Sequence, residues 1–163
     1  MNGNVEPDTD VANSGGNWAL LDQSLHDLSN VSVGTIKYLN PTGSKIDDAT
    51  NEVGEDVTVV PLACTATTIT VKADSSVDPS VAVTYTLRVG TTITAIDIGV
   101  ASSDLVNTAL SCQMSGSNVC SASASVPVSA NALVDVSANV QLAGEGTTST
   151  PFVHNVAIAL VCQ

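Results

Sequence analysis

The chain is poor in aromatic side chains, and this shortage narrows what its core and its binding sites can be. Aromatic residues make up 2% of the 163 residues and comprise Trp18, Tyr38, Tyr85 and Phe152. The core must therefore be built from Val, Ile, Leu and Ala, which together with the abundant Thr and Ser suit half-buried β-sheets. Glycan sites that rely on stacking platforms need aromatic rings that this chain lacks, whereas sites built on hydrogen bonds do not.

Basic side chains and long apolar segments are also scarce. Lys and Arg number 4 against 16 acidic residues, which gives a formal net charge of -12. We expect no nucleic-acid partner, because no basic stripe is present to neutralise phosphates. No apolar run reaches the roughly 18 residues of a membrane span, so we expect no membrane insertion. The first ten residues are polar and acidic, unlike a signal peptide. We expect either a removed signal or an export route that needs none, such as release of a virion by lysis.

The cysteines lack the spacing of a metal site. There are 4 of them, and no CxxC pair occurs, so a zinc site is not expected. Four cysteines allow three pairings. We favour Cys112–Cys120, across a short hairpin, and Cys64–Cys162, between an early strand and the last one. The alternative is four buried free thiols. Disulfides would place the protein outside the reducing cytoplasm.

No catalytic constellation is found. Nucleophilic catalysis needs a nucleophile, a base and an orienting group within reach of one another. The only imidazoles, His26 and His154, are isolated, and no G-x-S-x-G motif occurs. The adjacent acids Asp47–Asp48 and Glu55–Asp56 belong to an acidic loop, and such neighbours rarely converge on one substrate. We predict a protein that is not an enzyme and has no catalytic residues.

The chain divides near residue 56. Residues 1–56 hold ten of the 16 acids and are predicted to form an extended, partly flexible N-terminal arm. A strand is predicted over 33–40. A short helix is predicted over 17–29, because four apolar residues share one helix face: Trp18, Leu21, Leu25 and Leu28. These four are candidates for self-association. The alternative is a short helix or a strand that covers one end of the domain.

Residues 57–163 predict a compact antiparallel β-domain. Apolar and polar residues alternate strictly over 81–89 and over 134–142, which is typical of half-buried strands. The final strand, 152–162, is apolar on both faces. This predicts a central place in a sheet or contact with another subunit.

Two strand-breaking segments support this division into strands. Pro61 predicts an edge or a bulge within the long β segment 57–73. Ser115–Asn118 predicts a hairpin loop. Seven to nine strands with regular turn signals indicate a two-sheet sandwich or a barrel.

The order of segments resembles the jelly-roll domains of the C1q/TNF-like group. The residues that carry the resemblance read VVPLACTATTITVKAD, VTYTLRVGTTITAI, LSCQMSGSNVCSASASVPVSANALVDVSA and VAIALVCQ. The likeness is to bacterial and phage members, such as the C-terminal domains of collagen-like spore-surface proteins and some phage fibre or decoration domains. It implies an antiparallel jelly-roll β-sandwich, a homotrimer with one sheet of each subunit facing the threefold axis, and a role in display or attachment. The chain departs from the group in having no Gly-X-Y stretch and few aromatics.

Two further sites are candidates. Carboxylates on loops can bind calcium, the one cofactor that we consider, and the candidates are Asp47, Asp48, Asp74 and Asp78, with Asp8 and Asp10 in the arm. Solvated acidic loops are the alternative. Asn30 begins an N-x-S glycosylation sequon.

These observations favour a structural subunit of an extracellular, cell-surface or virion assembly, which associates with itself as a trimer or polymer. A receptor- or carbohydrate-binding module that recognises a cell-surface glycan or receptor is the second hypothesis. The third is a fibre subunit, in which the strand over 33–40 would add to the sheet of the next copy.

Overall fold

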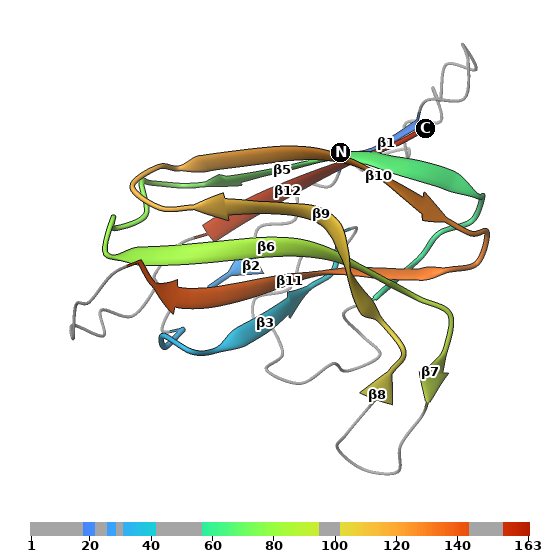
Figure 1. Ribbon diagram of the computed structural model, residues 1–163, viewed down its shortest axis with the longest axis horizontal. Coiled ribbons are helices and arrows are strands. Elements are labelled where there is room, and N and C mark those ends of the chain that lie inside the picture. The colour runs from blue at the N-terminus through green and yellow to red at the C-terminus, as the bar shows by residue number, and fades with distance from the viewer. Residues whose placement is uncertain (1–17, 22–25, 29–30, 42–56, 95–101, 144–154) are drawn as a thin grey trace, which may run out of the picture.

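The protein is a sandwich of two antiparallel β-sheets (Figure 1). The computed structural model describes residues 18–21, 26–28, 31–41, 57–94, 102–143 and 155–163, and these ranges contain strands but no helix. The strands are β1 (Trp18–Leu21), β2 (His26–Asp27), β3 (Ile36–Leu39), β4 (Thr58–Val59), β5 (Cys64–Ala73), β6 (Val81–Gly90), β7 (Ile93–Thr94), β8 (Ser102–Ser103), β9 (Val106–Met114), β10 (Val119–Val128), β11 (Leu133–Leu142) and β12 (Asn155–Cys162).

Each sheet is named here after a central strand. The β12 sheet has the order β1-β12-β5-β10, with β2 also paired to β12, and the β11 sheet has the order β3-β11-β6-β9, with β4 also paired to β11. β7 and β8 form a separate two-stranded ribbon, which extends beyond one end of the sandwich in Figure 1. β12 lies between β1 and β5, so the prediction of a central place for the last strand is confirmed.

The strand pairing is that of a jelly roll. Apart from the two-residue strands, the first strand pairs with the last (β1 with β12), the second with the second last (β3 with β11), the third with β10 and the fourth with β9. Such nested pairing folds one long hairpin over on itself into two sheets, as in other eight-stranded jelly rolls. The predicted all-β jelly-roll sandwich is therefore confirmed.

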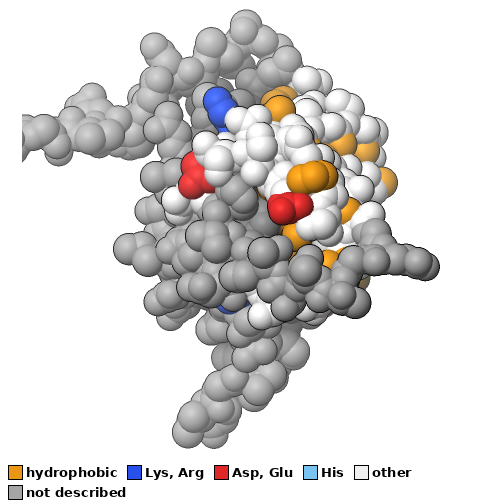
Figure 2. Space-filling model, turned by 90° about the vertical axis from the view of Figure 1, so that its left-hand side faces the viewer, with side chains coloured by type: hydrophobic (Ala, Val, Ile, Leu, Met, Phe, Trp, Pro, Cys, Tyr) orange, Lys and Arg blue, Asp and Glu red, His pale blue; other side chains and the backbone are white. Residues whose placement is uncertain are grey.

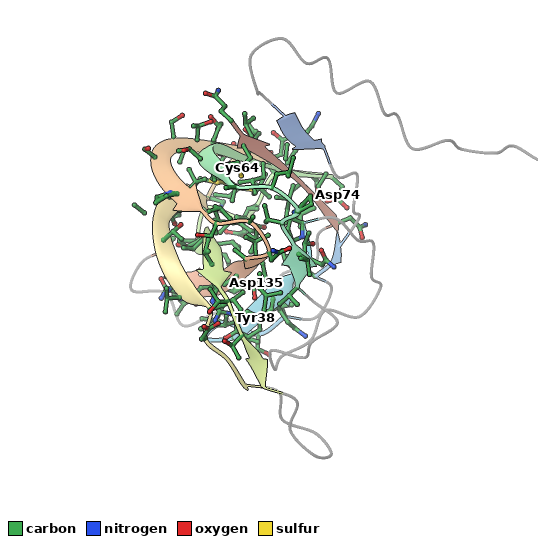
Figure 3. The ribbon with its side chains drawn as sticks, turned by 90° about the vertical axis from the view of Figure 1, so that its right-hand side faces the viewer. Tyr38, Cys64, Asp74 and Asp135 are labelled. Carbon is green, nitrogen blue, oxygen red and sulfur yellow. A yellow bond between two sulfur atoms is a disulfide. The ribbon has the colours of Figure 1, made fainter. Side chains whose placement is uncertain are left out.

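Aliphatic side chains fill the space between the sheets, as the shortage of aromatics predicts. Strict alternation sends the odd-numbered residues of β6 and the even-numbered residues of β11 inward, including Val83, Leu87, Val136 and Val140. Tyr85 is fully buried among them. Full burial of each such aliphatic side chain contributes about 1.5–3 kcal/mol. Figure 3 looks at the sandwich end-on and shows side chains filling the space between the two layers.

The chain crosses between the sheets at the two strand-breaking segments predicted from the sequence, the one that contains Pro61 and the loop 115–118. β4 pairs in the β11 sheet and β5 in the β12 sheet, so the segment that contains Pro61 is a crossover. The loop 115–118 also joins one sheet to the other, because β9 pairs with β6 and β10 with β5. The loop was predicted correctly, but β9 and β10 do not form the hydrogen-bonded hairpin that we expected.

The N-terminal segment differs from the prediction. Residues 18–21 and 26–27 are strands paired with β12, so the helix predicted over 17–29 does not form in the described residues. The strand predicted over 33–40 is present as β3 and pairs with β11. The described part of the arm therefore belongs to both sheets of the sandwich. Residues 1–17 and 42–56 lie outside the described residues.

Candidate functional site

The outer faces of the two sheets are the candidate binding surfaces, because the inner faces pack against each other in the core. On the outer face of the β12 sheet, residues in register form three rows across three strands. The rows are Val119, Lys72 and Ala157; Ser121, Thr70 and Ala159; and Ser123, Thr68 and Val161. All but Lys72 are small or medium-sized and uncharged, so this face, here called the small-residue face, has few protrusions.

No acidic side chain lies in these three rows, although the whole chain has 16 acids. The outer positions of β12, Ala157, Ala159 and Val161, are half-buried although they point away from the core. Thr70 and Ser121 satisfy each other with a hydroxyl–hydroxyl hydrogen bond of 2.9 Å. These two hydroxyls therefore keep a hydrogen bond if another flat surface covers the face, and no carboxylate of the three rows would lose its solvation.

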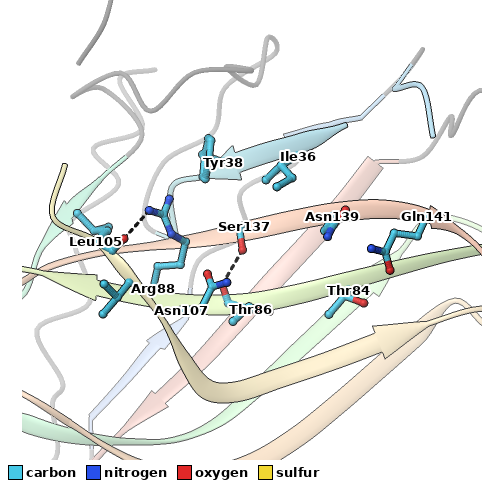
Figure 4. Close-up of a pocket in the computed structure, with 11 residues that line it drawn as sticks. Ile36, Tyr38, Thr84, Thr86, Arg88, Leu105, Asn107, Ser137, Asn139 and Gln141 are labelled. Carbon is cyan, nitrogen blue, oxygen red and sulfur yellow. Dashed lines mark hydrogen bonds between the residues drawn. The ribbon is translucent and has the colours of Figure 1, made fainter. Parts of the chain in front are cut away.

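The outer face of the β11 sheet is different, because it is hollowed into a groove. The groove has a volume of about 510 Å³ and is lined from β3, β11, β6 and the start of β9 (Figure 4). Its lining consists mainly of amide and hydroxyl side chains: Thr84, Thr86, Asn107, Ser137, Asn139 and Gln141. Its walls also include Ile36, Tyr38, Leu105 and Val106, and Arg88 lies at one end.

A buried ion pair lies at this end of the groove. Arg88 on β6 and Asp135 on β11 are register partners, and Arg88 Nη1 donates to Asp135 Oδ2 at 3.2 Å. Arg88 and Asp135 are only 6% and 1% exposed, although both occupy outward positions of their strands. The ring of Tyr38 stacks on the guanidinium, with its centroid 4.7 Å from Cζ. A cation, an anion and a ring thus fix one another, and the pair adds no net charge to the groove.

The chain after β8 closes this end of the groove. Arg88 Nη2 donates to the backbone carbonyl of Leu105 at 2.7 Å. Gly90 permits this approach, since a Cβ there would lie 2.9 Å from the backbone nitrogen of Leu105. Asp104 anchors the same segment by accepting from the N–H of Thr91 at 2.7 Å and the N–H of Thr92 at 2.8 Å.

A bulge between β6 and β9 shapes the neighbouring wall. Thr86 pairs with Ser111, but Arg88 pairs with Asn107, so β9 has two more residues than β6 in this interval. Within the bulge the backbone pairing of β6 with β9 is interrupted. There the hydroxyl of Thr108 donates to the backbone carbonyl of Leu87 at 2.8 Å. The bulge bends β9, as Figure 1 shows.

Three amide side chains of the groove have no hydrogen bond to any residue in the described ranges: Asn107, Asn139 and Gln141. Asn139 is half-buried, and Asn107 and Gln141 are exposed. Each offers a carbonyl acceptor and an NH₂ donor.

The two favoured disulfides are both present. Cys64–Cys162 joins β5 to β12 within one sheet, with the Cα atoms 5.6 Å apart. Cys112–Cys120 has Cα atoms 5.7 Å apart. It joins β9 to β10 and therefore links the edges of the two sheets, whereas we expected it to cross a hairpin ladder. Two disulfides are compatible with an oxidising environment.

The calcium candidates do not converge in the described residues. Asp74 accepts from the N–H and side-chain amide of Asn155, each at 3.2 Å, and Asp78 accepts from the N–H of Ser80 at 2.8 Å. The donors at Ser80 lower the pKa of Asp78. No group of three metal-binding side chains occurs among the described residues. Asp47, Asp48, Asp8 and Asp10 lie outside them, and calcium binding stays a prediction.

The self-association candidates, the two histidines and the glycosylation sequon do not form a common site in the described residues. Trp18 and Leu21 lie in the strand β1 and not in the predicted helix. Leu28 is fully buried in the core, so it is not available to another subunit. His26 belongs to β2. Leu25, Asn30 and His154 lie outside the described residues.

The sequence prediction missed the groove and its ion pair. A signal was nevertheless present, since Arg88 and Asp135 are the only charged residues in their alternating strands and have opposite charges. Cross-strand pairing of such residues is common in antiparallel sheets. The sequence alone could not predict that Asn107, Asn139 and Gln141 share one site. They become neighbours only when β11 and β9 pair with the two sides of β6.

Comparisons of the chain with protein-family models, with curated proteins and with solved structures find no match. Within the described ranges, the structure contains no helix of the length and hydropathy that a membrane span requires.

Proposed function

We propose that this protein is a structural subunit of an extracellular, cell-surface or virion assembly, and that copies associate through the small-residue face of the β12 sheet. The observation that carries the proposal is the absence of acidic side chains from the rows of this face in a chain of net charge -12. The other features support it without identifying the assembly.

Charge explains why this face suits a second copy. Copies of a chain with net charge -12 repel one another, and the repulsion is greatest where acids face acids. Contact through the small-residue face brings no acids of its three rows together and buries Ala157, Ala159 and Val161. Such burial stabilises an interface by about 25 cal/mol per Å² of apolar surface, before the costs of association.

The remaining expectations fit this function. Two disulfides suit a surface location, and the nested strand order supports the resemblance to the C1q/TNF-like group. That resemblance implies a trimer. The fibre alternative is less favoured, because β3, the strand it would donate, is already paired with β11 of its own chain.

The test is the molecular mass of the purified protein, measured by multi-angle light scattering, for the native chain and two variants. Ala159→Asp adds a negative charge in the middle row of the small-residue face. Val59→Asp is the matched control, because Val59 is 56% exposed on β4 of the other sheet. We expect an oligomer for the native chain and the control, and monomer for Ala159→Asp. A monomeric native chain at micromolar concentration, or an oligomer that Ala159→Asp leaves intact, would rule out this interface.

A further inference from the structure

We infer that the groove on the outer face of the β11 sheet is a binding site for a neutral saccharide. The groove and the small-residue face belong to the outer faces of different sheets, which are the two layers of the sandwich in Figure 1. This inference therefore does not depend on the proposed assembly. Its volume of about 510 Å³ falls within the roughly 300–1,000 Å³ of small-molecule sites. It is large enough for a mono- or disaccharide.

The lining chemistry points to hydroxyl groups as the ligand's contacts. A sugar hydroxyl both donates and accepts, and so does a side-chain amide. Asn139 and Gln141 follow one another along the outer face of β11, and Asn107 comes from β9 (Figure 4). None of the three is engaged by a described residue, so all three can bond to a ligand.

The electrostatics disfavour charged ligands. Arg88 donates to Asp135 and to the carbonyl of Leu105, so its positive charge is compensated. The rest of the lining is uncharged. An anionic sugar would meet a chain of net charge -12 without a free cation in the groove lining to attract it.

The groove also has the rigidity and the apolar surface that a sugar site needs. The stack of Tyr38 on Arg88 and the burial of Asp135 fix one end of the lining before a ligand arrives. Ile36 and Tyr38, side by side on β3, offer an apolar wall to the C–H face of a sugar ring (Figure 4). Preorganisation of this kind reduces the entropy lost on binding.

The experiment is a titration of the ¹⁵N-labelled protein, followed by its side-chain NH₂ signals. The probes are four neutral disaccharides (lactose, maltose, cellobiose and chitobiose) and one anionic sugar, sialyllactose. We expect saturable shifts of the signals of Asn107, Asn139 and Gln141 with at least one neutral disaccharide, and none with sialyllactose. The inference fails if no neutral disaccharide gives saturable shifts at millimolar concentration, or if sialyllactose binds best.

Substitutions then test the position of the site. Asn139→Ala and Gln141→Ala should each weaken binding of that disaccharide roughly three- to tenfold, the effect of one lost hydrogen bond. Gln163→Ala is the matched control. Gln163 is an exposed amide outside the groove lining, and it follows β12 of the other sheet. Equal losses in all three variants, or unchanged affinity in the two groove variants, would overturn the assignment. Because Gln141 is exposed, its variant keeps the test informative even if Asn139→Ala folds poorly.

Discussion

The two outer faces of the sandwich follow the same alternating pattern but present different surfaces. On β12 and β5 the outward residues of the three rows are small or medium-sized and uncharged apart from Lys72, and the face is suited to contact with another flat surface. On β6 and β11 most of the outward residues that line the groove are polar, and three outward polar side chains, those of Arg88, Asp135 and Ser137, are buried outside the main core. Strand alternation therefore decides which residues face outward, whereas their size and charge decide what the face can do.

The largest expected effect concerns the two disulfides, one within the β12 sheet and one between the sheets. Loss of Cys64–Cys162 should lower the free energy of unfolding by about 5 kcal/mol, because it closes a loop of 98 residues. Loss of Cys112–Cys120, with a separation of 8, should cost only about 2.5 kcal/mol. Urea unfolding of the two Cys→Ala double variants, without reductant, measures both. Equal losses would contradict the chain-entropy argument and indicate that the link between the sheets matters as much as the longer loop.

The buried ion pair should give the next largest effect. Asp135→Ala leaves the guanidinium of Arg88 buried without its carboxylate and should destabilise the protein by about 3–5 kcal/mol. Thr70→Ala, at an outward position of the other sheet, should cost only about 0.5–1.5 kcal/mol for its bond to Ser121. Chemical denaturation compares the two.

A double variant sharpens this comparison. Replacing both charges, as in Arg88→Met with Asp135→Leu, should recover most of the stability lost in Asp135→Ala, since no unpaired charge remains. If Asp135→Ala is no worse than Thr70→Ala, the outer face of the β11 sheet behaves as an ordinary surface, and the contrast between the two faces disappears.

A smaller effect, of opposite sign, is expected in the main core. Tyr85 is fully buried, and this burial raises the pKa of its hydroxyl. The hydroxyl has no hydrogen-bond partner among the described residues. Tyr85→Phe removes this unsatisfied group and should stabilise the protein by about 1 kcal/mol. Tyr38→Phe, which keeps the ring over Arg88, should give no such gain. A higher urea midpoint for Tyr85→Phe alone would verify this, and a lower one would indicate that the hydroxyl is solvated.

The sequence predicts the fold better than the sites, and particular residues show why. The alternation over 81–89 and 134–142 is local, so the inward and outward faces of β6 and β11 were predicted correctly. Residues 18–21 and 26–27, within the helix predicted over 17–29, form strands instead. Short strands give a weak alternation signal, and the pairing of β1 and β2 with β12 overrides local preference. The groove depends on the order β3-β11-β6-β9, a set of long-range pairings that no local pattern specifies.

The smallest expected effect concerns acid stability at the closed end of the groove. The N–H of Thr92 and the hydroxyl and N–H of Thr91 all donate to Asp104 and lower the pKa of this carboxyl below its usual 3.8. The folded state therefore binds the proton less readily than the unfolded chain. The carboxylate stabilises the fold above the unfolded pKa, and this contribution is lost as the pH falls through the lower, folded value.

Asp104→Asn should accordingly flatten the dependence of the urea midpoint on pH below about pH 5. Asp78→Asn is the matched comparison at the turn before β6, where Ser80 supplies two hydrogen bonds to the carboxylate instead of three. The flattening should be greater for Asp104→Asn. Because Asp104 anchors the segment that presents the Leu105 carbonyl to Arg88, its variant should also alter saccharide-induced shifts at Asn107, while Asp78→Asn should not. Identical behaviour of the two variants would show that the anchoring of this segment has no influence on the groove.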